Sequence, residues 1–332
     1  METLPPFRVA TPATIAEAVA AAQESRAARF IAGGTDLMVN LRHGIGAPDV
    51  LIDLRGIVDL HGVWTDLAGT TVGAAVTLAE LAGDAALAAR YPAVAEAAAA
   101  VGAPAHREAG TVGGNLCLDT RCVFYNRSAW WREANGFCLK HQGSVCHVAP
   151  TGTRCHAAFS GDLAPALLVH DATVEIAGPQ GLRRQALDAL YAEDGAAHLR
   201  LAPGEFLTRV ILPADSARSA YAKARARAAI DFPLAGVAVA LRAEAGRVAA
   251  LRVAITGTNA RPLLLAGTEA LLGAAVDVDA AWLERLGKLV QKQVQPMRTT
   301  LLAAQYRRRV AAALAQRLAA TLAGAASQAH AA

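Results

Sequence analysis

The sequence predicts an α+β fold with two domains, and two features of its 332 residues lead to this expectation. In the first part, short apolar segments alternate with helical patterns, and a glycine pair at 33–34 lies between a predicted strand and a predicted helix. From Leu234 the pattern changes to two alternating strands over 237–242 and 248–255, followed by helices. A chain of this length can form two or three domains, and we expect a first domain in two subdomains and a second domain that contains the alternating strands.

The first subdomain begins with a helical pattern. Thr11-Pro12 places a proline at the first turn, and Ile15, Val19 and Ala22 share one face. Residues 29–32 predict a short buried strand, the glycine pair leads into a helical pattern through Asn40, and 50–54 predict a second strand. A glycine pair in this setting allows backbone N–H groups to approach a phosphate, although an ordinary tight turn is the common alternative.

The remaining elements are read from the same patterns. In the second subdomain we expect strands over 71–77, 173–176 and 204–213, and helical segments from Leu78, over 81–100 and over 163–170. In the second domain we expect a further strand over 221–227, helices over 263–272, 279–292 and 299–323, and a disordered tail over 325–332.

Composition argues against several classes of function. Hydrophobic residues make up 54% of the chain, but alanine supplies much of that share. No run of about 18 strongly apolar residues occurs, so no membrane span is predicted. The first residues lack the basic and apolar segments of a signal peptide, and we expect a cytoplasmic protein. The net charge of +4 and the basic run Arg307-Arg308-Arg309 do not make a nucleic-acid surface, and we interpret the run as a solvated or subunit-facing helix surface.

All five cysteines lie between residues 117 and 155. Disulfides would fit an exported protein, and gaps of four, fifteen, seven and eight intervening residues lack the close pairs typical of structural zinc sites. An iron–sulfur cluster tolerates wider spacing, because its four thiolates surround a larger object. Spacing alone favours the cluster only modestly, so disulfides and zinc remain alternatives at this point.

The segments around the cysteines carry a resemblance to a known family. Residues 31–37 read IAGGTDL, 109–117 read AGTVGGNLC, and 161–165 read GDLAP. They resemble the flavoprotein subunits of the molybdenum hydroxylases, the xanthine dehydrogenase and carbon monoxide dehydrogenase family. In that family the last two segments stand close together in sequence, whereas 45 residues separate Leu116 from Asp162 here. A subgroup with such an insertion is the β subunit of 4-hydroxybenzoyl-CoA reductase, to which the whole chain is similar.

The resemblance implies a two-part FAD-binding domain of the PCMH (vanillyl-alcohol-oxidase-like) type over 1–217, with subdomains 1–60 and 61–217. It implies that a C-terminal domain of antiparallel sheet and helices, like that of CO dehydrogenase flavoproteins, follows over 218–324. The resemblance also implies a 4Fe-4S cluster in the inserted loop over 118–160. The family often has NLC at the end of the glycine segment, which assigns Cys117 to the flavin site. His147 or His156 is the alternative to one of the cysteine ligands, and the expected ligands are Cys122, Cys138, Cys146 and Cys155.

Several residues that the resemblance places against FAD also have a structural interpretation. Thr77 and Asp162 could cap the helices that follow them, Phe206 and Leu207 could be core residues, and Lys223 could be solvated. The expected FAD contacts are Arg29, Phe30, Ile31, Ala32, Gly33, Gly34, Thr35, Asp36, Leu37, Thr77, Gly110, Thr111, Gly114, Asn115, Cys117, Asp162, Phe206, Leu207 and Lys223.

The function that the resemblance implies is electron transfer, with no catalytic residue in this chain. Electrons would pass from a reduced ferredoxin through the 4Fe-4S cluster and FAD to a small 2Fe-2S subunit. A large molybdopterin-binding subunit would then reduce 4-hydroxybenzoyl-CoA to benzoyl-CoA. We expect a dimer of such heterotrimers. Another molybdenum hydroxylase, acting on an aromatic or aldehyde substrate, and a flavin subunit with structural zinc remain alternatives.

The insertion is rich in basic residues. They outnumber Asp119 and Glu133, and we expect them to help dock an acidic ferredoxin. These residues are Arg121, Arg127, Arg132, Lys140 and Arg154.

Overall fold

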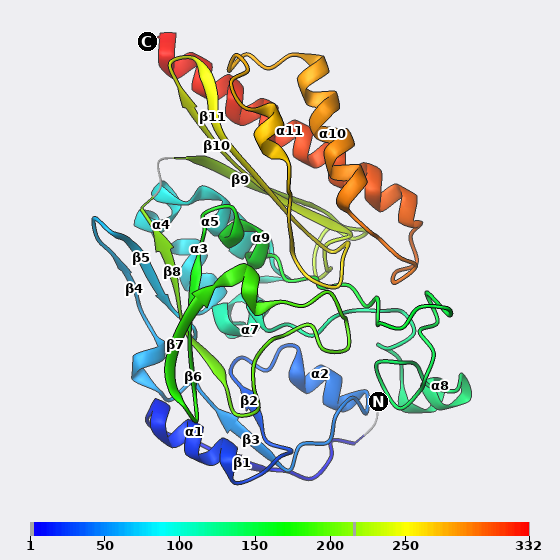
Figure 1. The fold of residues 1–332 in the computed structure, drawn as a ribbon. Helices are drawn as coiled ribbons and strands as arrows, with labels where there is room; N and C mark the ends of the chain where they lie inside the picture. The colour runs from blue at the N-terminus through cyan, green and yellow to red at the C-terminus, as the bar shows by residue number, and fades with distance from the viewer. Residues whose placement is uncertain (1–2, 215–216, 332) are drawn as a thin grey trace.

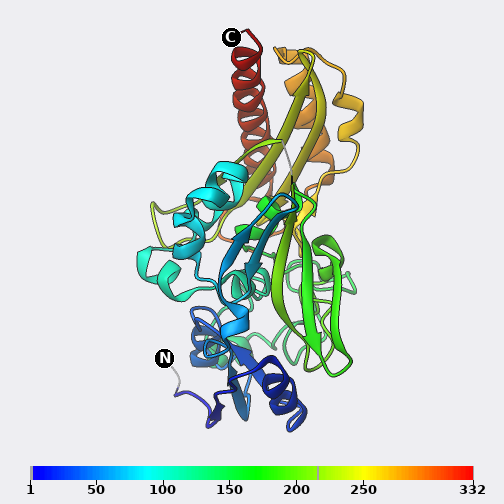
Figure 2. The same ribbon diagram turned by 90° about the vertical axis from the view of Figure 1, so that its left-hand side faces the viewer.

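The computed structural model describes residues 3–214 and 217–331. Three sheets stack along the molecule, with a three-stranded sheet at the bottom of Figure 1, a five-stranded sheet in the middle and a four-stranded sheet at the top. The turned view in Figure 2 shows the same succession, with the C-terminal helix standing beside the top sheet. The cysteine-rich insertion, with α8 (Ala129–Ala134), projects to the right in Figure 1.

The bottom sheet is parallel, with β3 between β1 and β2. The first helix begins after Thr14, whose hydroxyl accepts a hydrogen bond from the Glu17 backbone N–H at 3.2 Å. The start predicted at Pro12 is therefore too early, because the threonine hydroxyl satisfies the first free N–H groups. The elements are β1 (Arg8–Ala10), α1 (Ile15–Gln23), β2 (Arg29–Ile31), α2 (Leu37–Arg42) and β3 (Val50–Asp53).

The middle sheet is antiparallel in the order β4-β5-β8-β6-β7, and short helices pack beside it. Strand β7 was not predicted, because its sequence GLRRQA does not alternate in hydrophobicity; it lies at the sheet edge, where polar residues are tolerated. The elements are η1 (Val58–Leu60), β4 (Val63–Thr65), β5 (Gly69–Gly73), α3 (Leu78–Gly83), α4 (Ala85–Arg90), α5 (Pro92–Ala100), α6 (Pro104–Ala109), α7 (Val112–Leu116), α9 (Leu163–Leu168), β6 (Thr173–Gly178), β7 (Gly181–Ala186), η2 (Leu187–Leu190) and β8 (Phe206–Pro213).

The alanine-rich segment 81–100 forms parts of three helices rather than one. Asp84 ends α3 and caps α4, because its carboxylate accepts a hydrogen bond from the Leu87 N–H at 2.8 Å. Pro92 then occupies the first turn of α5. Both residues are typical helix-start signals, which the uniform alanine content had obscured.

The top sheet is buried on both faces around β10. Val237, Val239 and Leu241 pack with α10 and α11, whereas Ala238 and Ala240 face the core shared with α5 and α9. The small alanine side chains let the middle helices approach this sheet closely, so β10 contributes to the core of the first domain as well as to the separate core of the second. The elements are β9 (Arg218–Ala224), β10 (Ala235–Glu244), β11 (Arg247–Thr256), β12 (Leu263–Leu264), η3 (Thr268–Leu271), α10 (Ala280–Gln293) and α11 (Ala304–Ala331).

Three expectations for the C-terminal domain are wrong. Residues 263–272 do not form one α-helix: Leu263 pairs with Ile255 in the sheet, Gly267 takes a left-handed φ of 80°, and the helical part is the short 3-10 helix η3 (Thr268–Leu271). The backbone over 325–331 continues α11, in keeping with the high helix propensity of its alanines. Arg307 is fully buried, and of the basic run Arg309 is the residue on the exposed surface.

The insertion is closed at its base and fastened to the first subdomain. Arg121 and Ala158 exchange backbone hydrogen bonds of 2.7 and 2.8 Å, which brings the two ends of the loop together. The buried Arg132 guanidinium donates to the carbonyl oxygens of His43 and Gly44, both at 2.9 Å. These charged hydrogen bonds act together with apolar packing of Ile45 against the insertion to hold the loop to the segment after α2.

In residues 3–214 and 217–331, no helix is both long enough and apolar enough to cross a membrane.

Candidate cofactor site

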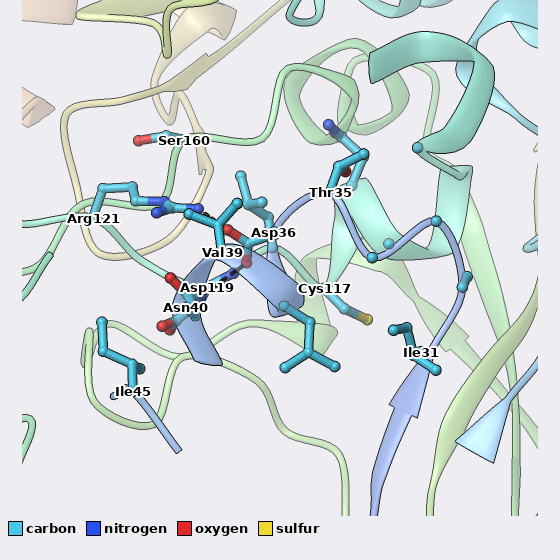
Figure 3. A pocket seen from close by; sticks show the side chains of 18 of the residues that line it. Ile31, Thr35, Asp36, Val39, Asn40, Ile45, Cys117, Asp119, Arg121 and Ser160 are labelled. Carbon is cyan, nitrogen blue, oxygen red and sulfur yellow. Dashed lines mark hydrogen bonds and ion pairs between the residues drawn. The ribbon is translucent and has the colours of Figure 1, made fainter. Parts of the chain in front are cut away.

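A cavity of about 920 Å³ lies where the two subdomains, the insertion and the loop after β9 meet. One wall comes from β2, the glycine pair and α2, and the opposite wall from α6 and α7. Figure 3 shows Ile31, Thr35, Asp36 and Cys117 among the residues that line it. A cavity of this size, with many backbone atoms in its walls, suits a large polar cofactor.

The glycines make this cavity possible by letting two backbone segments touch. A Cβ atom at Gly33 would lie 1.8 Å from the carbonyl oxygen of Ala109, so no other residue fits there. Gly34 has a φ of 67°, in the left-handed region that favours glycine. The first glycine pair is therefore required both for the turn after β2 and for its contact with the segment before α7.

The second glycine segment joins the two flanks of the insertion. The Thr111 hydroxyl accepts a hydrogen bond from the Gly114 N–H at 3.1 Å and so begins α7. The Asn115 Oδ1 accepts one from the Leu163 N–H at 3.0 Å, and a Cβ at Gly161 would lie 2.6 Å from the Asn115 carbonyl oxygen. The chain thus returns from the insertion to the place where it left.

Asp162 stands at the return point and is fully enclosed. The Tyr221 hydroxyl donates to its Oδ1 at 2.6 Å, and the Lys223 ammonium lies 3.0 Å from the same oxygen. Burial raises the pKa of Asp162, and the Lys223 charge opposes this rise. Asp162 makes no side-chain cap for α9, so the capping interpretation is wrong; Asn115 makes that bond instead.

Most of the predicted FAD contacts line the cavity, and four do not. The Thr77 hydroxyl is engaged in a capping box with Glu80, whose backbone N–H donates to it at 3.1 Å. The Phe206 ring packs on Phe30, with ring centroids 4.7 Å apart, and reaches the cavity only through that neighbour. The residues outside the lining are Thr77, Phe206, Leu207 and Lys223.

Sequence reasoning missed a wall of the cavity that the insertion supplies. Tyr125, Lys140 and His141 line it, together with the loops over 196–199 and 230–232. These residues belong to no glycine motif. One feature of the sequence could have predicted them. If the GDLAP segment packs against the glycine segment, the loop between the two must lie beside the same cavity.

An ion pair joins the first glycine segment to the insertion. Arg121 pairs with Asp36, as Figure 3 shows, and stacks over the Phe232 ring with its guanidinium 4.5 Å from the ring centroid. Burial lowers the pKa of Arg121 to about 10. The Asp119 backbone N–H also donates to Asp36, at 3.3 Å, so the acidic residue of the IAGGTDL segment holds the start of the insertion.

The five cysteines divide into a group of four and a single thiol. Cys122, Cys138 and Cys155 share one buried cluster, and Cys146, which is also buried, contributes to the raised pKa of Cys122 and Cys155. Cys117 instead lines the cavity, where burial raises its pKa to about 12. All five are free thiols, so the disulfide alternative is wrong. This division follows the predicted assignment of Cys117 to the flavin segment.

The described residues contain no set of three or more histidine, cysteine or acidic side chains placed to hold a metal ion. The predicted 4Fe-4S cluster is therefore not shown by the structure, and neither is a zinc site. The ring nitrogen of His147 meets the Phe137 carbonyl oxygen at 2.5 Å, so this alternative ligand is already engaged by the backbone.

The basic residues of the insertion do not form the expected docking surface. Lys140 and Arg132 are buried, Arg121 pairs with Asp36, and Arg154 donates to the Glu193 carbonyl oxygen at 2.7 Å. Arg127 is the member of the group that lies on the exposed surface. The charges hold the insertion in place, which the sequence alone could not distinguish from a binding face.

Two family models match the chain over most of its length. The model described as the FAD binding domain in molybdopterin dehydrogenase matches residues 5–215. The model described as the CO dehydrogenase flavoprotein C-terminal domain matches residues 219–322. The predicted fold class is thereby confirmed.

Curated relatives agree with this assignment. The aldehyde oxidoreductase FAD-binding subunit PaoB of Escherichia coli (strain K12) is 32% identical over 276 residues, which cover 80% of this chain and 84% of that subunit. The carbon monoxide dehydrogenase medium chain of Afipia carboxidovorans is 28% identical over 311 residues, covering 92% of this chain and 93% of that one.

Solved structures share the architecture. A chain of the Cu,Mo-CO dehydrogenase, in its cyanide-inactivated form, superposes with a TM-score of 0.79 at 25% identity, covering 97% of this chain and 99% of that one. A chain of quinoline 2-oxidoreductase from Pseudomonas putida 86 has the same fold, with a TM-score of 0.78 at 23% identity over 98% of this chain and 99% of that one. The narrower resemblance to 4-hydroxybenzoyl-CoA reductase is not shown by these comparisons. The comparisons do show the family: the chain belongs to the FAD-binding medium subunits of the molybdenum hydroxylases.

Proposed function

We propose that the chain carries electrons between FAD, held in the cavity, and a 4Fe-4S cluster, held by the insertion. The observation that carries this proposal is that the four-cysteine group and the cavity share a wall, since Tyr125 lines the cavity and packs in the cluster of Cys122, Cys138 and Cys155. When bound, the two groups supply the electron chemistry; the protein positions and insulates them.

The cavity has a polar end and an apolar wall, and both suit FAD. The glycine segments bring bare backbone next to the space that a pyrophosphate would fill, and Gly34 keeps its turn in the left-handed region. Asp162, lining the cavity and fixed by Tyr221, can accept a hydrogen bond from a cofactor hydroxyl group. Ile31 and Leu37 offer apolar contacts to a flat ring system.

The four buried thiols support a cubane more than a single ion. Burial raises the pKa of Cys155 to about 12 and that of Cys122 to about 11, so without a metal these groups are neutral and inert. A 4Fe-4S cluster needs its ligands spread around a larger object than one metal ion does. Cys122, Cys138, Cys146 and Cys155 would ligate it, while Cys117 stays with the flavin.

For the enzyme as a whole, we propose a ferredoxin-dependent 4-hydroxybenzoyl-CoA reductase. The inserted cysteine-rich loop between the GGNLC and GDLAP segments supports this choice. The chain would work in the cytoplasm beside a molybdopterin-binding large subunit and a 2Fe-2S small subunit, in a dimer of heterotrimers. The substrate would be reduced at the large subunit, and no residue of this chain would contact it.

A second candidate is an aldehyde-oxidising member of the same family. The 32% identity to the FAD-binding subunit PaoB, an aldehyde oxidoreductase subunit, favours it. Both candidates require the same FAD cavity, and they differ in the substrate-binding partner and in whether the substrate is reduced or oxidised.

Cofactor analysis of the anaerobically purified chain tests the proposal. We expect about one FAD, four iron and four sulfide per chain. Cys138→Ser should lose the iron, and Cys117→Ser, the matched control, should retain it. Zinc in place of iron would overturn the cluster. Co-purified partners assayed with reduced ferredoxin and 4-hydroxybenzoyl-CoA, and separately with aromatic aldehydes, then decide between the two enzymes.

A further inference from the structure

Tyr221 and Lys223 reach from the second domain into the wall of the cofactor cavity. They are two residues apart on β9, so their side chains lie on the same face of that strand. Both contact Asp162, which lines the cavity where the chain returns from the insertion. All three side chains are buried, although aspartate and lysine are rarely buried unless they are paired. A carboxylate in the wall of the cavity is therefore held by the second domain.

The contacts leave Asp162 able to accept one more hydrogen bond. A carboxylate offers about four acceptor positions on its two oxygens. The Tyr221 hydroxyl donates to Oδ1 at 2.6 Å, and the Lys223 ammonium lies 3.0 Å from Oδ1 and 3.2 Å from Oδ2. These contacts use both positions on Oδ1 and one on Oδ2. Oδ2 thus keeps a position for a donor in the cavity, such as a hydroxyl group of FAD.

The Tyr221 hydroxyl has little freedom to move. The Tyr221 backbone N–H donates to the Glu96 carboxylate of α5 at 2.6 Å, and its strand pairs with β10. On β10, Gly236 leaves room for the phenol, because a Cβ there would lie under 3.0 Å from the Tyr221 hydroxyl oxygen. A donor fixed in this way fixes the direction of the carboxylate that accepts from it.

The positive charge of Lys223 favours the form of Asp162 that accepts hydrogen bonds. Burial raises the pKa of Asp162, and this rise is opposed by the charge of Lys223, by the hydrogen bond from Tyr221 and by the charge of Arg225. An ionised carboxylate only accepts, and hydrogen bonds to a charged acceptor are about twice as strong as those between neutral groups. Lys223 lies outside the cavity lining, so its effect on a cofactor passes through Asp162.

We infer that Tyr221 is a positioning residue for FAD, through whose hydroxyl the second domain directs Asp162 at a hydroxyl group of the bound cofactor. The affinity for FAD then depends on a residue that does not line the cavity, and on the glycine at 236 that makes room for it. The inference rests on the proposed function, because it requires FAD in the cavity. It does not depend on what the cysteines bind.

Removal of one hydroxyl group provides the test. Tyr221→Phe keeps the ring and loses the hydrogen bond to Asp162. Tyr91→Phe is the matched control, because Tyr91 is also buried and donates to the Pro213 carbonyl oxygen at 2.8 Å, but is not among the residues that line the cavity. The full chain and each variant would be freed of FAD. Fluorescence titration with FAD then gives the Kd, and urea unfolding gives the stability.

We expect Tyr221→Phe to raise the Kd for FAD about fivefold, the factor that corresponds to one ordinary hydrogen bond. Tyr91→Phe should lower the stability and leave the Kd unchanged. An equal Kd in the two variants would overturn the inference, because the Tyr221 hydroxyl would then serve the fold alone.

A double-mutant cycle tests whether Tyr221 acts through Asp162. Asp162→Ala combined with Lys223→Met removes the carboxylate without leaving a buried charge unpaired. In that background, Tyr221→Phe should leave the Kd unchanged. A further fivefold rise there would mean that the hydroxyl does not act through Asp162, and the inference would be overturned.

A second cycle decides if that background does not fold. Gly236→Ala should displace the Tyr221 hydroxyl and weaken FAD binding, and it should weaken it no further in Tyr221→Phe; additive losses would overturn the inference. Failure of the unmodified chain to bind FAD would instead overturn the proposed flavin site, and the inference with it. Binding of FAD that is insensitive to Tyr221→Phe would overturn the inference alone.

Discussion

Replacing Gly33 with alanine tests whether contact between the two glycine segments builds the cofactor cavity. The new Cβ would lie 1.8 Å from the Ala109 carbonyl oxygen, whereas Cβ atoms are essentially never found under 3.0 Å from a neighbour. The segments must therefore move apart by at least 1.2 Å, the difference between these two distances. Both contacting groups are backbone, so no flexible side chain can yield.

The cost of this movement should appear in stability and in binding. Overpacking of this kind costs about 1–3 kcal/mol of unfolding free energy. FAD must touch both segments at once, and we expect its affinity to fall at least about tenfold, equal to about 1.4 kcal/mol. Urea unfolding of the FAD-free chain and fluorescence titration with FAD measure the two effects separately.

Gly83→Ala is the matched control for Gly33→Ala. A Cβ at Gly83 meets no atom within 4 Å, and the residue ends α3, so alanine should leave stability unchanged or raise it by up to about 1 kcal/mol. If Gly33→Ala unfolded at the same urea concentration as the unmodified chain and bound FAD equally well, the argument that backbone contact defines the cavity would be refuted.

Three other substitutions test single interactions. Thr77→Ala should remove the capping box of α3 and cost about 1 kcal/mol without changing FAD content; a loss of FAD would show that Thr77 contacts the cofactor after all. Arg307→Met should lower the unfolding free energy by at least about 3 kcal/mol, since the buried guanidinium donates to the carbonyl oxygens of Leu234 and Met297 at 3.0 and 2.9 Å. Arg309→Met, at an exposed position, should change the unfolding free energy little. Equal losses in the two variants would contradict this prediction. Burial lowers the pKa of His198 to about 4 from 6.5, so the unfolded chain binds the extra proton and stability should fall by about 2 kcal/mol from pH 7 to pH 5. His198→Gln should remove this fall in unfolding free energy between pH 7 and pH 5. If the variant lost as much stability over that range as the unmodified chain, His198 would not be its cause.

The sequence could predict the backbone of the cofactor site because glycine requirements are local. The left-handed turn at Gly34 is such a local requirement, whereas the need for glycine at 33 comes from its contact with Ala109, far along the chain. The flanks of the insertion were recognisable for the same reason. Hydrophobic periods predicted separate strands and helices, because they report on burial one element at a time, and the fold class itself came from the family resemblance.

Side-chain roles were less predictable, because a partner far along the chain decides them. Lysine at 223 could be solvated or buried, and only the return of Asp162 beside β9 settles that it is buried and paired. Thr77 could bind a cofactor or cap a helix, and the position of Glu80 beside it decides for the cap. Helix ends in alanine-rich segments were misplaced because alanine gives no signal of where a helix stops.

The charges of the insertion show most clearly why composition is a weak guide to a binding face. The partners of Arg121 and Arg154 are Asp36 and Glu193, both outside the insertion. Once these pairs form and Arg132 donates to the carbonyl oxygens of His43 and Gly44, just after α2, the exposed charges of the loop are reduced to Arg127 and Glu133. Such a nearly neutral face offers little long-range attraction to an acidic donor. The basic residues instead fix the loop, and Lys140 does so from within it by donating to Asp119 and to the Thr120 carbonyl oxygen.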